Sequence, residues 1–149
     1  MRDYKKEAGI FRETVQLHFL KLHQTMSTVG LGKGQPPILH HLSLKDGCMQ
    51  SEIAKGEMKT PATTTVMLQT MEKNGLIERR SDPEDLRRMR VYITDKGREA
   101  EKNATLALAK MDEDIYSVFT DEEYEEFFRL LNKMNGRMKE LLDRKEQGL

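Results

Sequence analysis

The chain has 149 residues, of which 37% are hydrophobic and 34% charged, and its 25 Lys and Arg balance 25 Asp and Glu. This composition suits one compact, largely helical domain whose apolar helix faces are exposed or covered by a partner. No apolar run approaches the roughly 20 residues that span a bilayer, and a single cysteine excludes internal disulfides and cysteine-based zinc clusters.

The first predicted helix covers Tyr4 to Val29, after a charged start that lacks the apolar stretch of an export signal. We therefore expect a cytoplasmic protein with no membrane partner. Apolar residues three or four positions apart form a stripe along this helix. The stripe is Phe11, Val15, Phe19, Leu22, Met26 and Val29, and a second apolar side contains Ile10, Leu17 and Leu20. A helix that is apolar on two sides needs more than one neighbour.

A pair of helices is predicted in the middle of the chain. The segment GLGKGQPP ends the first helix, and a short helix follows from Ile38 to Leu44. QSEIAKGE then predicts a short helix, MKT a tight turn, and PATTTVMLQTMEKN a longer helix that ends before Gly75. Thr60 can cap this longer helix, Pro61 suits its first position, and Gly75 can adopt the left-handed conformation after it. A helix–turn–helix unit of this kind is typical of DNA-binding proteins, although ordinary exposed helix pairs have the same pattern.

The longer helix of this pair has two different faces. The face expected in the core contains Thr64, Met67, Leu68 and Met71. The opposite face has few charges and no acid before Glu72, and contains Ala62, Thr63, Val66, Gln69, Thr70 and Lys73. A face without carboxylates is not repelled by phosphate, so it is permitted in a DNA groove.

A β-hairpin is predicted next, from LIERR and MRVYIT with the polar loop SDPEDLRR between them. Ile77, Val91 and Ile93 should pack inward, and Asp82-Pro83 suits the first two positions of a turn. Five arginines crowd the stem and tip of the hairpin: Arg79, Arg80, Arg87, Arg88 and Arg90. An arginine on a narrow projection can enter the minor groove. A solvated charge run explains the same pattern, since acidic residues in the loop nearly offset the arginines.

Two long amphipathic helices are predicted after the hairpin. Thr94 can cap the first, which opens with Asp95 and runs to about Phe119 with the stripe Ala100, Ala104, Leu108, Met111, Ile115 and Val118. Thr120 and Glu123 form a capping box that starts the second. Its stripe is Tyr124, Phe127, Phe128, Leu131, Met134, Met138, Leu141 and Leu142. These faces exceed what the central module can cover, which predicts a homodimer. An intramolecular three-helix bundle remains the alternative.

From about Gly34 to Gly97 the sequence resembles the MarR family of winged helix-turn-helix transcriptional regulators. The residues that carry the resemblance are QPPILHHL, QSEIAKGEMKTPATTTVMLQTMEKNGLIERR and DPEDLRRMRVYITDKG. The densest signature is Asp85-x-Arg87 followed by Ile93-Thr94 and Gly97. The resemblance implies that Arg87 reaches the minor groove and that Asp85 helps to hold the wing.

The same resemblance implies further assignments in the recognition helix and the assembly. Thr65 matches a threonine common in that helix, whereas many relatives carry a basic residue at the next position and this chain has Val66, which favours contact with a thymine methyl. We expect double-stranded palindromic DNA as partner. The expected DNA contacts are Thr60, Pro61, Ala62, Thr63, Thr65, Val66, Gln69, Arg79, Asp85, Arg87 and Arg88. The first and last helices are implied to interleave across a two-fold axis.

Cysteine and histidine provide few candidate sites. Cys48 precedes a helix N-terminus, which favours a reactive thiolate and an oxidant-sensing role, yet cysteine is commonly a small buried hydrophobe. His18 and His23 are five positions apart and His40 and His41 are adjacent, so the members of each pair point to different faces. We expect no metal site, with a site assembled between helices or subunits left open.

No Gly-rich phosphate loop, HExxH or GxSxG motif is present, so we predict that the chain is not an enzyme and needs no cofactor. The resemblance implies a cavity for a small apolar or aromatic effector between the terminal helices and the central module. The residues expected there are His18, Leu22, Met26, His41 and Met111.

The sequence therefore predicts a mostly α (α+β) fold, a winged helix-turn-helix with a two-stranded hairpin wing and long N- and C-terminal dimerisation helices. The expected division is 1–30 for the first dimerisation helix, 35–98 for the DNA-binding module and 99–149 for the C-terminal dimerisation helices, within one compact domain. The expected function is a repressor that a small molecule releases from its operator. A winged-helix module that binds other proteins, or a cysteine-based redox sensor, remain the alternatives.

Overall fold

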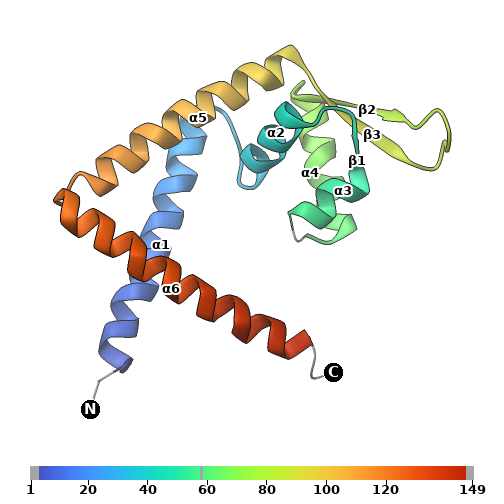
Figure 1. The fold of residues 1–149 in the computed structure, drawn as a ribbon. Coiled ribbons are helices and arrows are strands. Elements are labelled where there is room, and N and C mark those ends of the chain that lie inside the picture. Colours follow the sequence, from blue (N-terminus) through green and yellow to red (C-terminus); the bar gives the residue numbers. More distant parts are fainter. Residues whose placement is uncertain (1–3, 58, 147–149) are drawn as a thin grey trace. The chain divides into compact units, whose positions relative to one another are not determined.

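The structure of the protein, a computed structural model, describes residues 4–57 and 59–146. Within these ranges it consists of six helices and three strands (Figure 1). They are α1 (Tyr4–Thr28), α2 (Gln35–Leu44), β1 (Cys48–Met49), α3 (Gln50–Gly56), α4 (Pro61–Lys73), β2 (Ile77–Ser81), β3 (Met89–Ile93), α5 (Asp95–Tyr116) and α6 (Asp121–Glu146). Met58 of the predicted turn, and the ends of the predicted N- and C-terminal regions, lie outside the described residues. The mostly helical winged-helix fold predicted from the sequence is confirmed.

The chain divides into two compact units, residues 1–111 and residues 112–149. The first contains everything from α1 to most of α5, and the second contains the end of α5 and all of α6. No helix in the described ranges has the length and apolar character required to cross a membrane.

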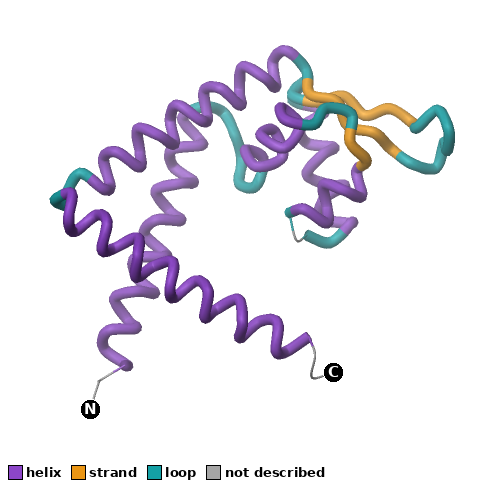
Figure 2. The backbone as a smooth tube through the Cα atoms, in the orientation of Figure 1, coloured by secondary structure: helices purple, strands orange, loops and turns teal. Residues whose placement is uncertain are grey.

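The sheet of the first unit is antiparallel with strand order β1-β3-β2. Ile77 pairs with Ile93 and Ser81 with Met89, so β2 and β3 form the predicted hairpin, which extends from the helices in Figure 2. The strand β1 lies on the other side of β3, where Cys48 pairs with Val91. The sequence predicted only two strands, because two residues are too short to show an alternating pattern.

The core of the first unit lies between the sheet and the helices. Its most deeply buried side chains come from α2, α3, α4 and the strands, and include Leu39, Leu42, Ile53, Leu68, Met71, Ile77 and Val91. Burying a side chain of this kind contributes about 1.5 to 3 kcal/mol. Thr64, Leu68 and Met71 are buried and Met67 packs against the core, as the spacing along α4 predicted.

The predicted helix caps are present. The Thr60 hydroxyl accepts a hydrogen bond from the Thr63 amide at 3.2 Å, and the Thr94 hydroxyl accepts one from the Gly97 amide at 3.0 Å. Gly75 has φ of 74°, which a side chain would strain. The Thr120 amide donates to Glu123 at 3.0 Å, and the Glu123 amide donates to Thr120 at 3.3 Å, which completes the capping box.

Gly97 fixes the junction between the hairpin and α5. A Cβ atom at this position would lie 2.1 Å from the backbone oxygen of Leu76 and 2.8 Å from Cγ1 of Ile93. Only glycine allows α5 to start this close to the base of β2. This packing gives a physical reason for glycine at the end of the wing signature.

Two predicted helix boundaries were wrong. The helix α2 begins at Gln35 rather than Ile38, because Pro36 and Pro37 lie in its first turn, where their missing N–H groups leave no helix bond unmade. The helix α5 ends at Tyr116 rather than near Phe119, and a short turn connects it to α6.

Both long terminal helices have exposed apolar side chains. On α1 they include Ile10, Phe11, Val15, Leu17, Phe19 and Leu20. On α6 they include Leu130, Met138, Leu141 and Leu142. Five aromatic rings in the second unit contact one another, with neighbouring centroids 4.7 to 5.8 Å apart: Tyr116, Phe119, Tyr124, Phe127 and Phe128. The apolar stripes predicted along α1 and α6 therefore lie largely outside the core.

Candidate nucleic-acid interface

The exposed face of α4 is formed by small, uncharged side chains. Ala62, Thr63 and Gln69 are exposed, and Val66 is 63% exposed. The core face of the same helix is anchored by Leu68 and Met71, so the helix presents the predicted face to solvent. A face without carboxylates can approach bases and phosphates without repulsion.

Several threonines on α4 use their hydroxyls within the protein. The Thr65 hydroxyl donates to the backbone oxygen of Pro61 at 2.9 Å and accepts from the Gln50 amide at 2.7 Å. The Thr70 hydroxyl donates to the backbone oxygen of Val66 at 3.1 Å. Thr65, an expected DNA contact, is half-buried and links α4 to α3. Its hydroxyl proton is therefore not available for a base.

The tip of the wing is organised by Asp85. Its Oδ1 accepts hydrogen bonds from the backbone amide and from Nε of Arg87, each at 3.1 Å, and its Oδ2 lies 3.6 Å from Nε of Arg88. The hydrogen bond from the Arg87 side chain holds the pKa of Asp85 below its ordinary value. The Arg87 side chain is nevertheless 91% exposed. The tip thus consists of an oriented cation open to solvent, on the projecting hairpin of Figure 1.

The loop of the wing depends on a buried carboxylate, Asp82, which the sequence indicated only as part of a turn. Asp82 is only 3% exposed, and its Oδ2 lies 3.5 Å from Nη2 of Arg90. Its Oδ1 accepts from the Glu84 amide at 3.1 Å, and its own amide donates to the Arg88 backbone oxygen at 2.8 Å. These bonds close the loop on itself. Asp82 was assigned to a turn, and only the tertiary contact with Arg90 reveals its second role.

Glu72 and Arg79 connect α4 to the wing. Glu72 accepts three hydrogen bonds from Arg79: from the backbone amide at 2.8 Å, from Nε at 3.3 Å and from Nη2 at 3.0 Å. The Arg79 side chain is only 16% exposed, so its guanidinium is directed at the helix rather than at solvent. Arg79 was expected to touch DNA. Its geometry supports a role in holding β2 against the end of α4.

This pair leads to a prediction about stability. Hydrogen bonds from the Arg79 side chain hold the pKa of Glu72 below its ordinary value. A lowered carboxyl pKa stabilises the fold above the ordinary pKa, and the gain is lost as pH falls through the lowered one. Glu72→Gln should lower the free energy of unfolding by about 1 kcal/mol near pH 7, because water screens the 38% exposed carboxylate. Urea unfolding should show the difference from wild type shrinking as pH falls below the ordinary pKa.

The control for this prediction is Glu78→Gln in the neighbouring strand. Glu78 pairs with Arg80 at 2.6 Å, but both side chains are more than half exposed. Its loss should change the free energy of unfolding by less than about 0.5 kcal/mol. Equal effects of the two substitutions would show that the contact of Glu72 with Arg79 contributes no more to the free energy of unfolding than the exposed pair of Glu78 and Arg80.

A groove runs between α3, the start of α4 and the end of the wing. Its lining includes Gln50, Ser51, Lys55, Lys59, Thr64, Arg87 and Arg88. The Gln50 Oε1 and Thr64 Oγ1 atoms are buried and have no hydrogen-bond partner among the described residues. The four cations Lys55, Lys59, Arg87 and Arg88 make this groove suited to an anionic backbone. The sequence did not indicate Gln50 or the two lysines, because they come together only when α3 packs against α4.

Cys48 does not have the environment of a redox sensor. The side chain is 2% exposed and lies in β1, paired with Val91 on β3. Burial raises the pKa of the Cys48 thiol, so its reactive thiolate form is disfavoured. The redox-sensing alternative therefore loses its chemical basis.

The predicted effector residues have different environments. Met26 and Met111 are buried, Leu22 is partly buried against the core, and His18 is exposed on α1. His41 is half-buried, and its Nε2 atom has no hydrogen-bond partner within the described ranges. None of the five lines the basic groove. Whether they form one cavity stays a prediction.

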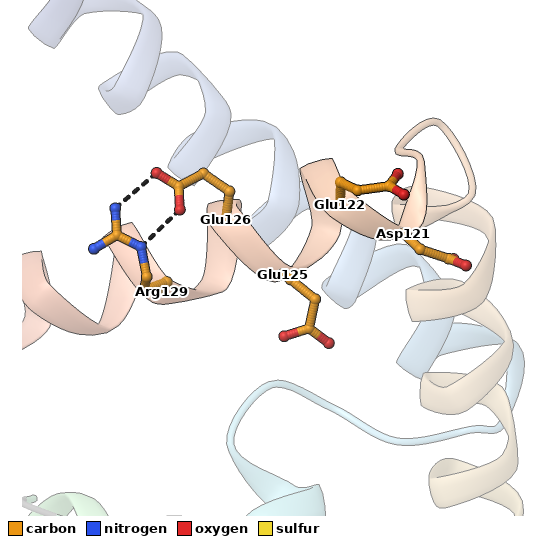
Figure 3. Close-up of a pocket in the computed structure, with 5 residues that line it drawn as sticks. All are labelled: Asp121, Glu122, Glu125, Glu126 and Arg129. Carbon is orange, nitrogen blue, oxygen red and sulfur yellow. Dashed lines mark hydrogen bonds and ion pairs between the residues drawn. The ribbon is translucent and has the colours of Figure 1, made fainter.

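The first turns of α6 carry an acidic cleft, shown in Figure 3. Asp121, Glu122 and Glu125 line it, together with Glu126, which pairs with Arg129 at 2.6 Å. Carboxylates at a helix N-terminus are favoured by the helix dipole, which accounts for this cluster. In the part of the chain that the structure describes, no group of three or more His, Cys, Asp or Glu is placed to hold a metal ion.

Comparisons with known proteins agree with this geometry. Residues 34–89 match the MarR family. The transcriptional regulator HosA of Escherichia coli O111:H- is 33% identical over 104 residues, which cover 70% of this chain and 77% of that protein. The HTH-type transcriptional regulator BilQ of Clostridium symbiosum is 28% identical over 131 residues, which cover 88% of each chain.

Solved structures give the same result. MepR, a transcription regulator of the Staphylococcus aureus multidrug efflux pump MepA, has a TM-score of 0.75 at 26% identity and covers 88% of this chain and 97% of its own. The S. aureus MepR–DNA complex has a TM-score of 0.73 at 26% identity, covering 88% of this chain and 96% of its own. PcaV from Streptomyces coelicolor has a TM-score of 0.81 at 22% identity, covers 89% and 97% of the two chains, and shows the fold alone. HosA, BilQ and MepR are each described as transcriptional regulators.

Proposed function

Since this chain belongs to the MarR family of winged-helix, DNA-binding transcriptional regulators, we propose that it is a homodimeric repressor of the cytoplasm. In this proposal the dimer binds a palindromic operator and leaves it when a small apolar or aromatic molecule binds. The observation that carries the proposal is the pairing of an uncharged α4 face with an exposed, oriented Arg87 on the same module.

Two kinds of contact would hold the module on DNA. Basic side chains of the groove, including Lys55 and Lys59, contact phosphates and fix the register. The exposed face of α4 enters the major groove, and Arg87 enters the adjacent minor groove. The proposed contact surface comprises Thr60, Pro61, Ala62, Thr63, Val66, Gln69, Arg87 and Arg88, with Thr65, Arg79 and Asp85 acting mainly by positioning their neighbours. The crystal structure of the related S. aureus MepR in complex with DNA supports DNA as the partner.

A homodimer is supported by the apolar side chains that α1 and α6 leave exposed. A second copy would cover them, since a monomer with stripes of this length tends to aggregate. A two-fold dimer places its two α4 helices about one turn of DNA apart, roughly 34 Å, and therefore requires a palindrome.

An effector would release the DNA by changing the spacing of the two α4 helices in the dimer. A small molecule shifts the equilibrium only by binding more tightly to one conformation of the dimer than to the other. We propose a site near His18, Leu22, Met26, His41 and Met111. The unpartnered buried Nε2 of His41 supports it, because a polar group of the effector would satisfy that atom.

The proposal is tested by selecting duplexes from a random pool with the purified protein. Palindromic duplexes should be enriched, and the affinity for them should fall steeply with salt because each phosphate contact releases counterions. A duplex containing one half-site should bind far more weakly. The outcome that favours a protein-binding winged-helix module is the enrichment of no duplex and the absence of any salt-dependent DNA binding.

A further inference from the structure

We infer that the two base pairs contacted by Val66 and Gln69 in each half-site are adjacent A·T pairs, an inference that rests on the proposed DNA-binding function. It concerns the operator sequence rather than the existence of an operator. The argument depends on which polar groups of α4 remain available for base edges.

The threonines of α4 have little capacity left for reading bases. The protons of the Thr65 and Thr70 hydroxyls are donated to backbone oxygens one turn earlier. The Thr60 hydroxyl donates to that of Thr63 at 2.9 Å, so these two share their bonding capacity at the helix start. A hydroxyl also bonds any base about equally well, because it donates and accepts. Threonines therefore contribute contact without strong discrimination.

Gln69 has both its donor and its acceptor available. The side chain is exposed, and its amide makes no hydrogen bond within the described part of the chain. A glutamine amide matches adenine in the major groove, because its oxygen accepts from N6 and its nitrogen donates to N7. No other base offers this pair of groups at that edge.

Val66 lies one turn before Gln69 on the same face and is 63% exposed. Side chains three residues apart on a helix are neighbours. In zinc-finger recognition helices, residues three positions apart contact successive bases, so Val66 and Gln69 can contact adjacent base pairs. An isopropyl group can contact only an apolar feature of a base edge, and the thymine methyl provides it. The pair next to the adenine is therefore also A·T.

Guanine readout lacks its usual donor in this region. The chain has no Arg or Lys from Pro61 to Glu72. Lys73 is the last residue of α4, one turn and about 6 Å beyond Gln69 along the helix axis, whereas a recognition helix contacts base edges with its N-terminal residues. Arg79 is bonded to Glu72, so it does not supply the missing donor either.

The test compares the half-sites that wild type and three variants select from a random duplex pool. Wild type should enrich two adjacent A·T pairs at one fixed place in each half-site. Gln69→Glu should change one of them to a C·G pair, because a carboxylate accepts from the cytosine amino group, with about a tenfold or greater change in relative affinity. Val66→Ser should remove the preference for A·T at the other base pair, so that all four bases are selected there about equally. Lys73→Gln is the control and should weaken binding without changing either preference.

The possible results separate this inference from the proposed function. Enrichment of palindromes in which the Gln69→Glu protein selects the same half-site as wild type would overturn the assignment of base pairs while supporting DNA binding. A G·C pair at the position that responds to Gln69 would overturn it as well. Failure of wild type to enrich any duplex would remove the proposed function itself. The three substituted positions, Val66, Gln69 and Lys73, are exposed, and circular dichroism would confirm that the variants are folded.

Discussion

Arg87→Ala should weaken operator binding by roughly a thousandfold. Each arginine that enters a groove contributes about 2 kcal/mol, and a dimer loses two of them. The slope of log affinity against log salt should also become shallower by about two, because two phosphate-neutralising cations are removed. The Arg87 side chain is 91% exposed, so the stability of the fold should not change. Fluorescence anisotropy with the selected palindrome, at several salt concentrations, measures both quantities.

Arg129→Ala provides the matched control for this prediction. Arg129 is an exposed arginine on α6 that pairs with Glu126, as Asp85 pairs with Arg87 on the wing. Its removal changes the net charge equally but should alter operator affinity less than about twofold, since Arg129 is not part of the proposed contact surface. Equal losses in the two variants would mean that Arg87 acts only through the total charge of the protein.

Val15→Asp should prevent dimerisation at micromolar concentrations. Val15 lies in the exposed apolar stripe of α1 and is 51% exposed. A carboxylate that becomes buried without a partner costs about 3 kcal/mol or more, and the dimer contains two copies. The dissociation constant should therefore rise by roughly ten thousandfold. Sedimentation equilibrium measures the change, and binding to the palindrome should be lost with it.

The control for Val15→Asp is Val15→Leu. Leucine keeps this position apolar and is similar in size to valine, so the apolar stripe of α1 stays continuous and the dimer should persist. A Val15→Asp protein that remains dimeric would show that the stripe is not the interface.

The parts of the fold that follow local rules could be predicted from the sequence. Thr60, Gly75 and Thr94 mark helix ends because capping depends on residues close together in the chain. The alternation around Val91 and the loop at Asp82-Pro83 predicted the hairpin for the same reason. The exposed position of Arg87 followed from its place at the tip.

The roles that depend on tertiary contacts could not be predicted. Glu72 and Arg79 are separated by a turn, and nothing in the local sequence distinguishes this pair from the neighbouring Glu78 and Arg80. The contact of Asp82 with Arg90 depends on the pairing of β2 with β3, and the bond from Gln50 to Thr65 requires α3 to pack against α4. The resemblance to a family assigned Thr65 to DNA, whereas its hydrogen bonds direct the hydroxyl into the protein.

Three hydrogen bonds between Glu72 and Arg79 connect the recognition helix directly to the hairpin stem. In the proposed dimer, each half would then meet DNA as one unit in which α4 and the wing keep a constant spacing. A rotation that moves α4 out of the major groove would also move the wing out of the minor groove, so both contacts with one half-site would be lost in a single step. The response to an effector would accordingly depend on small rotations of α4 and the wing together, and not on movement of one relative to the other.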